Sequence, residues 1–503
     1  MKPLVSAQMM TLADRYTIDS VGIPELVLME HAALAVVRQL EKRFGRCLAS
    51  TRGLIVAGHG NNGGDALTCA RLLIHGGCQP PVIYQLEGGK VSPSCKHQSK
   101  ILKNLGISIT HQFPNNLQSF DWIIDGFFGT GLSRTVDGLA GKIIRKLGSA
   151  ELQAWIIAVD IPSGLSANTG VPLGLCVRAN ETVTFGFIKK GLVTGMAAEH
   201  AGSLTLAEIG IPRTIPGLVV DAYLLEQSDV DLPARNPSGN KGQYGHVYVW
   251  AGVPEKQGAS ALVGMAALRS GAGLVSVIGE HLSELRPRLI PELMTEEVGG
   301  SFFSDKPAEV AVLGPGMGTQ AKQWSVFENA LRSPWTLVLD GDALTMLSEQ
   351  GEKAIALINK RSAQTLLTPH PKEAARLLGC SVQQIQSDRY QAIRKLALTF
   401  APAWIILKGR GTIIANKDSE LIVVNEGDSG LSKGGTGDVL AGLVGGIVAQ
   451  TANSQNIQRA LAASVFVHGR ASCRLSQKQG TQRASFASEI ADEIPAVLSE
   501  LGQ

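Results

Sequence analysis

Short apolar runs that each end in a polar or glycine-rich loop recur along the whole chain, and this repeat restricts the fold more than any other feature. Residues 53–57 and 155–160 have the composition of buried strands, and the first run is followed by a glycine-rich turn and an amphipathic stretch at 65–74. A second series begins with a strand at 246–250 and a helix over 259–270. Strands that alternate with helices predict an α/β fold, with a parallel, doubly wound, Rossmann-like sheet in the first half.

The length of the chain predicts two domains. Single hydrophobic cores stop growing at roughly 250–300 residues, and this chain has 503. Between residues 229 and 241 the sequence loses its periodicity and gains Pro, Gly and Asn, as linkers do. We therefore expect a first domain over residues 1–224 and a second over 225–503.

The charge balance excludes two classes of partner. A formal net charge of +3 over this length offers no electrostatic footprint for nucleic acid or for a membrane surface. The amino-terminal segment contains no apolar signal region, and nowhere do about 18 apolar residues follow one another without interruption. We expect a cytoplasmic protein that binds neither nucleic acid nor membranes.

Three loops of the first half carry polar side chains directly after a strand. The segment from Gly58 to Asp65, GHGNNGGD, joins a strand to a helix. Its glycines and the free N–H groups of the helix can receive an anion such as a diphosphate. Asp125 and Asp160 open two further loops of the same kind. A lone Asp at a strand end is usually a cap, but three such loops converging at the carboxyl edge of a doubly wound sheet predict a binding site.

The motifs GxGNNGGD, DxxFGTGL, AVDIPSG and TVTFGxxKxGL, in this order within residues 1–220, resemble the YjeF N-terminal domain, the family of NAD(P)H-hydrate epimerases. The resemblance implies a potassium ion held by the oxygen-bearing side chains of Asn62, Asp125 and Ser163. Exchange of the configuration at C6 of the hydrate requires proton transfer to and from the hydroxyl oxygen. Asp160 and Lys189 are the candidates for that transfer, and the sequence leaves open which of them moves the proton. The resemblance places against the substrate Asn61, Asn62, Gly63, Gly64, Asp65, Gly129, Thr130, Gly131, Leu132, Ser133, Arg134, Thr135 and Asp160.

The strongest motif of the second half is the run from Gly427 to Gly442, GDSGLSKGGTGDVLAG. A Gly-Gly-Thr-Gly turn that opens an apolar helix gathers backbone N–H groups into an anion cradle, and Asp438 is the carboxylate beside it. This pattern suits phosphoryl transfer, in which a carboxylate activates the attacking hydroxyl. The alternative is that the glycines serve only close helix packing and that Asp438 only caps the helix.

With GPGxG at 314–318, TPHPxE at 368–373 and KGxxT at 408–412, the GGTGD turn resembles the YjeF C-terminal domain. This is a ribokinase-like family of ADP-dependent NAD(P)H-hydrate dehydratases, and the resemblance covers about residues 226–500. It implies that, with Mg²⁺, a phosphoryl group passes to the C6 hydroxyl and then leaves as phosphate, with Asp438 as the base. It assigns ADP to Lys408, Gly409, Arg410, Gly411, Thr412 and Gly437. It assigns the hydrate to Ala259, Gly318, His370 and Asp438.

The two resemblances predict one chain with two linked activities. The first domain would interconvert the R and S forms of NADHX and NADPHX, the hydrates of NADH and NADPH. The second would convert the S form to NAD(P)H with ADP, giving AMP and phosphate. The alternative is a ribokinase-like kinase of a small molecule such as a vitamin precursor, fused to a non-catalytic binding domain, and the joint presence of Asn62, Asp125, Asp160 and Ser163 argues against it. A homo-oligomer is also expected, of a size that the sequence does not specify.

Overall fold

The structure of the chain is a computed structural model that describes residues 1–149, 152–280, 282–286, 289–451 and 457–502. It divides into two compact units, Lys2–Ala222 and Tyr223–Gln503, the second of which includes Met1. Within the described ranges, no helix is long and apolar enough to cross a membrane.

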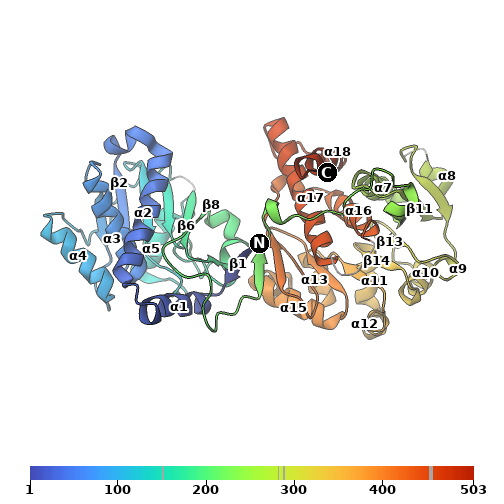
Figure 1. The fold of residues 1–503 in the computed structure, drawn as a ribbon, viewed down its shortest axis with the longest axis horizontal. Helices are drawn as coiled ribbons and strands as arrows, with labels where there is room; N and C mark the ends of the chain where they lie inside the picture. Colours follow the sequence, from blue (N-terminus) through green and yellow to red (C-terminus); the bar gives the residue numbers. More distant parts are fainter. Residues whose placement is uncertain (150–151, 281, 287–288, 452–456, 503) are drawn as a thin grey trace. The chain divides into compact units, whose positions relative to one another are not determined.

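The first unit is built on a six-stranded sheet in the order β3-β2-β4-β5-β6-β8 (Figure 1). All its neighbouring strands run parallel. This confirms the predicted α/β class for the first half of the chain. The strands are β2 (Gly53–Ala57), β3 (Val82–Gln85), β4 (Trp122–Gly126), β5 (Trp155–Val159), β6 (Glu181–Phe185) and β8 (Ser203–Ala207), with a separate parallel pair, β1 (Lys2–Val5) and β7 (Ile188–Lys189).

Helices cover both faces of this sheet, because alternate side chains of each strand point to opposite sides. Ile55 and Ala57 of β2 pack into the core beneath the helices that precede and follow that strand. Leu54 and Val56 pack into the opposite core with the apolar face of α5. The helices are α1 (Ala7–Arg15), which continues as a π-helical segment (Tyr16–Ser20), α2 (Glu25–Phe44), α3 (Asn61–His75), α4 (Pro93–Asn104), α5 (Gly138–Leu147) and α6 (Ala197–His200), with 3-10 turns at Gly45–Ser50 and Lys190–Leu192.

Helix α3 begins earlier than the sequence suggested. The amphipathic pattern predicted a helix from residue 65, but the structure starts it at Asn61. Glycine is a poor helix former, yet Gly63 and Gly64 belong to the first turn because there is no room for a side chain. A Cβ on Gly63 would lie 2.2 Å from the Gly58 carbonyl oxygen, and one on Gly64 would lie 2.6 Å from the methyl of Met29. Close packing therefore sets the start of this helix.

The second unit contains a larger sheet, with neighbours in the order β12-β11-β10-β13-β14-β15-β16-β17-β18. It is parallel from β12 to β16, and β17 and β18 are antiparallel additions. The α/β class is thus confirmed here as well. The strands are β10 (His246–Trp250), β11 (Leu274–Gly279), β12 (Met294–Glu297), β13 (Val310–Leu313), β14 (Thr336–Leu339), β15 (Thr365–Leu367), β16 (Trp404–Leu407), β17 (Thr412–Ala415) and β18 (Leu421–Val424), while β9 (Ala222–Leu224) lies where the chain passes between the units.

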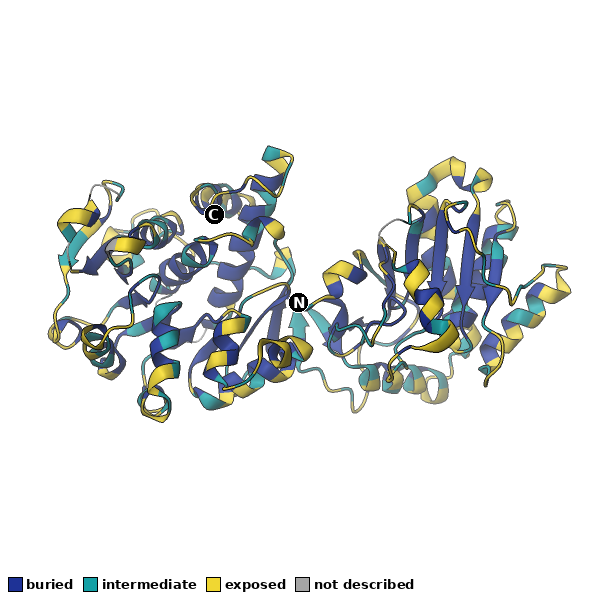
Figure 2. Cartoon of the chain, turned by 180° about the vertical axis from the view of Figure 1, so that it is seen from behind, coloured by how far each residue is buried: buried dark blue, intermediate teal, exposed yellow. Residues whose placement is uncertain are grey.

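Helix α16 (Thr436–Ala449) is the buried centre of the second unit. It packs against α7 (Gly258–Arg269) through glycines, since a Cβ on Gly442 would lie 2.2 Å from the Val263 carbonyl oxygen. In Figure 2 the central strands are buried, whereas edge strands such as β12 and β8 are partly exposed, and exposed residues line the outer faces of the helices. The other helices are α8 (Leu282–Leu285), α9 (Phe302–Asp305), α10 (Ala321–Arg332), α11 (Asp342–Gln350), α12 (Glu352–Asn359), α13 (Pro371–Leu377), α14 (Val382–Ser387), α15 (Arg389–Thr399), α17 (Ile457–Gln479) and α18 (Ala487–Glu500), with 3-10 turns at Gln227–Asp229, Lys241–Tyr244, Pro254–Lys256 and Ser429–Leu431.

Candidate active sites

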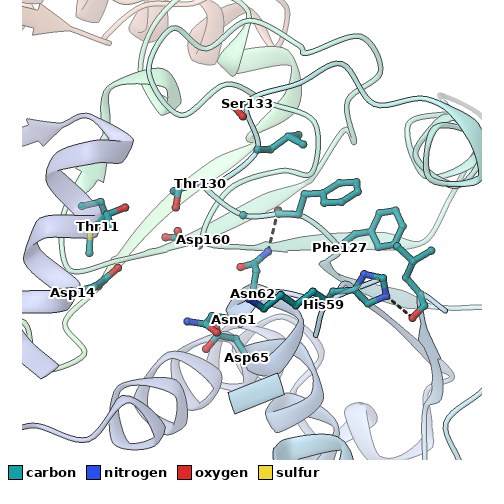
Figure 3. A pocket seen from close by; sticks show the side chains of 18 of the residues that line it. Thr11, Asp14, His59, Asn61, Asn62, Asp65, Phe127, Thr130, Ser133 and Asp160 are labelled. Carbon is teal, nitrogen blue, oxygen red and sulfur yellow. Dashed lines mark hydrogen bonds between the residues drawn. The ribbon is translucent and has the colours of Figure 1, made fainter. Parts of the chain in front are cut away.

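A cavity of about 1130 Å³ opens at the carboxyl edge of the first sheet (Figure 3). The edge is a topological switch point, because β2 is followed by a helix on one face and its neighbour β4 by a helix on the other. Ligands of doubly wound sheets bind in that position. The predicted residues that line the cavity are Asn61, Asn62, Asp65, Gly129, Thr130, Gly131, Leu132, Ser133, Arg134, Thr135 and Asp160.

Four other predicted residues lie behind the cavity wall. Gly63 and Gly64 are buried in the first turn of α3 and make room for backbone and for Met29. Asp125 and Ser163 are both fully buried. These four residues therefore lie beneath the surface of the cavity, and the residues around them form its lining.

Asp160 has the most constrained backbone of the lining residues. Among the described residues it is the one non-glycine residue with a left-handed φ, 64°, a conformation that persists only where the surroundings enforce it. Its Oδ1 accepts hydrogen bonds from the Thr184 hydroxyl (3.1 Å) and the Phe185 N–H (3.2 Å). Lys189, whose side chain is 1% exposed, donates to the same oxygen. The Asp160 carboxylate is thus held in one orientation at the cavity.

Asp125 is the centre of an oxygen-rich cluster beneath the loop that follows β4. It accepts from the Ser163 hydroxyl (2.6 Å) and the Ser163 N–H (2.8 Å). Asn62 donates its amide N–H to the Phe128 carbonyl (3.0 Å), and the Phe128 N–H donates to Ser163 (2.8 Å). Burial raises the pKa of Asp125 to about 6, against the effect of its hydrogen bonds. Carboxylate, hydroxyl and carbonyl oxygens lie together here with the Asn62 amide beside them, and oxygen ligands of these kinds suit a hard cation.

Two further carboxylates of the cavity were missed from the sequence. Asp14 of α1 and Glu25 of α2 line it together with Asp65 and Asp160, and Figure 3 shows Asp14, Asp65 and Asp160 around the same opening. Burial raises the pKa of Asp14 to about 7, against the nearby Lys189. Burial also raises the pKa of Asp65 well above its usual range, and neighbouring carboxylates add to the effect. No sequence spacing signals Asp14, because only tertiary packing brings α1 to this edge.

In the second unit, the Gly-Gly-Thr-Gly turn has the geometry of a cradle. Gly435 is the N-cap of α16 with φ of 90°, and nothing lies within 4 Å of a Cβ placed on Gly434. Gly434 therefore differs from Gly442, which serves helix packing, whereas a Cβ on Gly435 would lie 2.7 Å from the Leu262 side chain. Asp438 lies in the first turn of α16, and its pKa is raised to about 6, by burial first and then by Asp340, against Lys408. A carboxyl with that pKa can accept a proton near neutral pH.

Lys408 connects the predicted nucleotide loop to the carboxylates around Asp438. Its Nζ donates to Asp340 Oδ1 (2.6 Å) and lies 3.9 Å from Glu373. A Cβ on Gly437 would lie 3.5 Å from the same Nζ. Burial lowers the pKa of Lys408, but Asp340 and Glu373 outweigh it, so the net shift is upward. The lysine therefore stays charged.

The turn at residues 408–412 is held by an arginine that the sequence did not reveal. Arg389 is 1% exposed and donates to the carbonyls of Leu407 (3.0 Å), Lys408 (3.2 Å) and Gly411 (3.3 Å). Arg410 donates to the Gly427 carbonyl, and the Thr412 hydroxyl donates to Gly409. The predicted nucleotide loop is thus fixed on its inner side.

The remaining predicted residues of this site, His370, Gly318 and Ala259, lie on three different segments. His370 caps α13, accepting from the backbone N–H of Glu373 through Nδ1, and its pKa is lowered by burial and by Lys408. Gly318 donates its N–H to Asp342 (2.9 Å), one of the carboxylates that raise the pKa of Asp438. Ala259 lies at the start of α7, directly after the segment that contains Lys256, which also donates to Asp342.

The first α/β unit has a constrained carboxylate at a large cavity, and the second has a glycine-rich anion cradle beside a carboxyl group. These features are typical of a two-domain enzyme with one active site in each domain. The comparisons with known proteins agree in both halves. Residues 25–191 match the family described as YjeF-related protein N-terminus, and residues 247–496 match the family described as NAD(P)H-hydrate dehydratase.

The chain is similar along its length to curated proteins named bifunctional NAD(P)H-hydrate repair enzyme. The protein from Moorella thermoacetica is 34% identical over 99% of this chain and 97% of its own length. The Escherichia coli protein is 33% identical over 89% of this chain and 85% of its own. The chain belongs to the family of bifunctional NAD(P)H-hydrate repair enzymes. Among solved structures, a Bacillus subtilis ADP/ATP-dependent NAD(P)H-hydrate dehydratase co-crystallised with ATP and Mg²⁺ is 26% identical, with a TM-score of 0.49, over 55% of this chain and 97% of that one.

Proposed function

We propose that the first unit epimerises NADHX and NADPHX and that the second dehydrates the S epimer with ADP, releasing AMP and phosphate. The observation that carries the proposal is the family similarity across both units. Each unit also contains a lysine, fully buried in the first and largely buried in the second, beside a carboxylate of a candidate site. We further propose that the enzyme acts in the cytoplasm, and self-association stays a prediction.

In the proposed epimerase, Asp160 and Lys189 perform the proton transfer at the C6 hydroxyl. Inversion at that carbon requires the hydroxyl oxygen to gain or lose a proton. The Asp160 carboxylate lines the cavity, whereas Lys189 lies behind it and donates to it. Asp160 is therefore the group that meets the substrate, and Lys189 orients it and stabilises its charge. The loops at residues 61–65 and 129–135 would hold the dinucleotide.

The residues around Asp125 fit the proposed potassium ion. Asn62, Asp125 and Ser163 would hold it, together with the Phe128 carbonyl, which lies in the same hydrogen-bond network. Bound there, K⁺ would supply positive charge beneath the loop that carries residues 129–135. The chain's own contribution is to fix that loop, since Ser163 already joins it to β4.

In the proposed dehydratase, Asp438 takes the proton from the C6 hydroxyl as that oxygen attacks the β-phosphoryl group of ADP and AMP leaves. The C6–O bond then breaks to release phosphate, and loss of a proton from C5 restores the ring double bond. The N–H groups of the turn before α16, including that of Gly437, receive the transferred phosphoryl oxygens. Residues 408–412 would hold the nucleotide, and Ala259, Gly318 and His370 the hydrate. Mg²⁺ would neutralise phosphate charge, and because it is bound largely through phosphates and water, one or two carboxylates near Asp438 suffice.

The experiment follows the absorbance of reduced nicotinamide formed from an epimeric mixture of NADHX, with Mg²⁺ and K⁺, in the presence and absence of ADP. Complete, ADP-dependent recovery is expected. A plateau near half would leave only the dehydratase. No recovery with ADP or ATP would overturn the proposal in favour of a small-molecule kinase, in which the phosphate stays on the product.

One substitution separates the effect of the Asp160 carboxylate from that of its strained backbone. Asp160→Asn keeps a residue that tolerates a left-handed φ and removes only the charge, whereas Asp160→Ala removes the charge and adds strain. With the epimerase role, both variants plateau near half recovery on the fast time scale. Full recovery at the wild-type rate by Asp160→Asn would remove Asp160 from the reaction.

A further inference from the structure

The loop between β3 and α4, residues 86–92, lines the cavity of the first unit and has no role in the reaction described above. Leu86, Glu87, Gly88, Gly89 and Lys90 all contribute to the lining. Glu87 and Lys90 are exposed and carry opposite charges. A short loop at the cavity with one acidic and one basic side chain can discriminate between a neutral and a negatively charged group of a ligand.

The loop is fastened to the glycine-rich turn at both of its ends. His59 Nε2 donates to the Leu86 carbonyl (2.9 Å; Figure 3), and the Ser92 N–H donates to the His59 carbonyl (2.8 Å). At the tip, Gly88 and Gly89 both have left-handed φ, and a Cβ on Gly89 would lie 3.2 Å from the His59 ring. Glu87 and Lys90 flank this tip and are therefore held at the rim of the cavity.

The topology fixes which part of a dinucleotide reaches this rim. β2, α3 and β3 form a parallel crossover unit, with the glycine-rich turn directly after its first strand. In dinucleotide-binding units of this kind, the diphosphate lies at the helix N-terminus and the end of the second strand reaches the adenosine ribose. An acidic residue there accepts from the 2′-hydroxyl, and a basic residue binds a 2′-phosphate.

The position of Asp160 sets the same orientation independently. Asp160 follows β5, on the other side of β2 and β4 from the loop after β3. Three strand spacings separate β3 from β5, about 14 Å across the edge. A substrate whose reacting ring lies at Asp160 and whose diphosphate lies at α3 therefore extends its adenosine half toward Glu87 and Lys90.

We infer that residues 87–90 select between NADHX and NADPHX in the epimerase site, with Glu87 accepting from the ribose 2′-hydroxyl and Lys90 pairing with the 2′-phosphate. This inference rests on the proposed epimerase function and adds a substrate-selecting element to it.

The test measures interconversion of the R and S epimers by chromatography, using the full chain without ADP so that dehydration does not remove the product. NADHX and NADPHX are supplied separately, and the quantity compared is the ratio of kcat/KM for NADPHX to that for NADHX. Lys90→Met is expected to lower this ratio about tenfold, the worth of one charge-assisted hydrogen bond. Glu87→Gln is expected to raise it several-fold, because a carboxylate no longer repels the phosphate.

Arg15→Met is the matched control. Arg15 is also an exposed cation at the cavity, but α1 carries it, so its removal should leave the ratio unchanged. An equal fall of the ratio in Arg15→Met would mean that only the general field matters, and equal losses with both substrates in Lys90→Met would move Lys90 to the diphosphate. Either result overturns the inference. Failure of the wild-type chain to interconvert either hydrate would instead overturn the proposed function.

Discussion

Each unit buries a lysine against a carboxylate, but the two pairs relate to the cavity differently. Lys189 donates directly to Asp160, the carboxylate that lines the first cavity. Lys408 donates to Asp340 and lies 3.9 Å from Glu373, whereas Asp438 lies in the first turn of α16. In the first unit the lysine therefore fixes the reacting carboxylate itself. In the second it balances the surrounding carboxylates, while the reacting one keeps a pKa near 6.

The difference matches the chemistry proposed for each unit. Epimerisation returns every proton it takes, so a carboxylate held in one place by a cation serves both directions of the reaction. Phosphoryl transfer to a hydroxyl needs a base that takes up a proton, and a carboxyl with a raised pKa does so more readily. The same kind of lysine–carboxylate pair thus orients the reacting carboxylate in the first unit and neutralises neighbouring carboxylates in the second.

The strongest way to break the comparison is to remove the carboxylate that has no lysine of its own. Asp438→Asn should lower the ADP-dependent formation of NAD(P)H by about 10²–10⁴-fold, the usual worth of a general base. Epimerisation without ADP should not change, since it takes place in the other unit. Asp492→Asn, which removes an exposed carboxylate of the second unit paired with Arg269, is the control. Comparable rates for the two variants would show that Asp438 is no base.

The second test removes each lysine in turn. Lys189→Met should slow epimerisation about 10²-fold and lower the free energy of unfolding by about 3 kcal/mol, because the Asp160 carboxylate, which is only 14% exposed, loses its partner. The Thr184 hydroxyl and the Phe185 carbonyl, which Lys189 also contacts at 3.1 and 3.0 Å, lose a donor too. Lys408→Met should cost less, since Glu373, with a pKa of about 7, can take up a proton. Thermal unfolding measures the stability of both variants. A larger loss of stability in Lys408→Met than in Lys189→Met would reverse the comparison.

What the sequence predicted depended on how close the residues are along the chain. Asp160 and Asp438 stand beside recognisable loops, and the strand at 246–250 has the predicted bounds. Asp14 and Arg389 come from separate elements that packing brings to the sites, so no local pattern could reveal them. Asp340 directly follows β14, as Asp160 follows β5, and this strand-end signal was overlooked. The late predicted start of α3 has a related cause, because glycine propensity argues against a helix that tertiary contacts impose. The roles of all these residues stay predictions.

The third test uses pH to sharpen the contrast. Asp438 must be ionised to accept a proton, so the dehydratase rate should fall as the pH drops through about 6, the value to which burial and Asp340 raise its pKa. Asp342 also raises that pKa. Asp342→Asn should therefore move the acidic limb of the kcat profile to lower pH. A limb that stays in place in this variant would mean that another group controls it.

The smallest expected effect concerns stability in the first unit, where Asp14 faces the same cavity as Asp160. An aspartate ionises near pH 4 in an unfolded chain, whereas burial and the neighbouring carboxylates Asp160 and Glu25 raise the pKa of Asp14 to about 7, against Lys189. The folded state thus binds this proton more tightly. Its stabilising contribution is complete below about pH 4 and is lost as the pH rises through 7.

Asp14→Asn removes that dependence, so the variant should exceed the wild type in Tm by an amount that grows from pH 4 to 7 and then levels off. The expected gain in the free energy of unfolding above pH 7 is about 1–3 kcal/mol. Asp19→Asn, in the exposed part of the following π-helical segment, should show no such growth. If Asp14→Asn also slows epimerisation, the ionisable group serves the reaction at the expense of stability. A constant difference at every pH would mean that Asp14 titrates alike in the folded and unfolded chain, and the proposed burial of its carboxyl group would then be wrong.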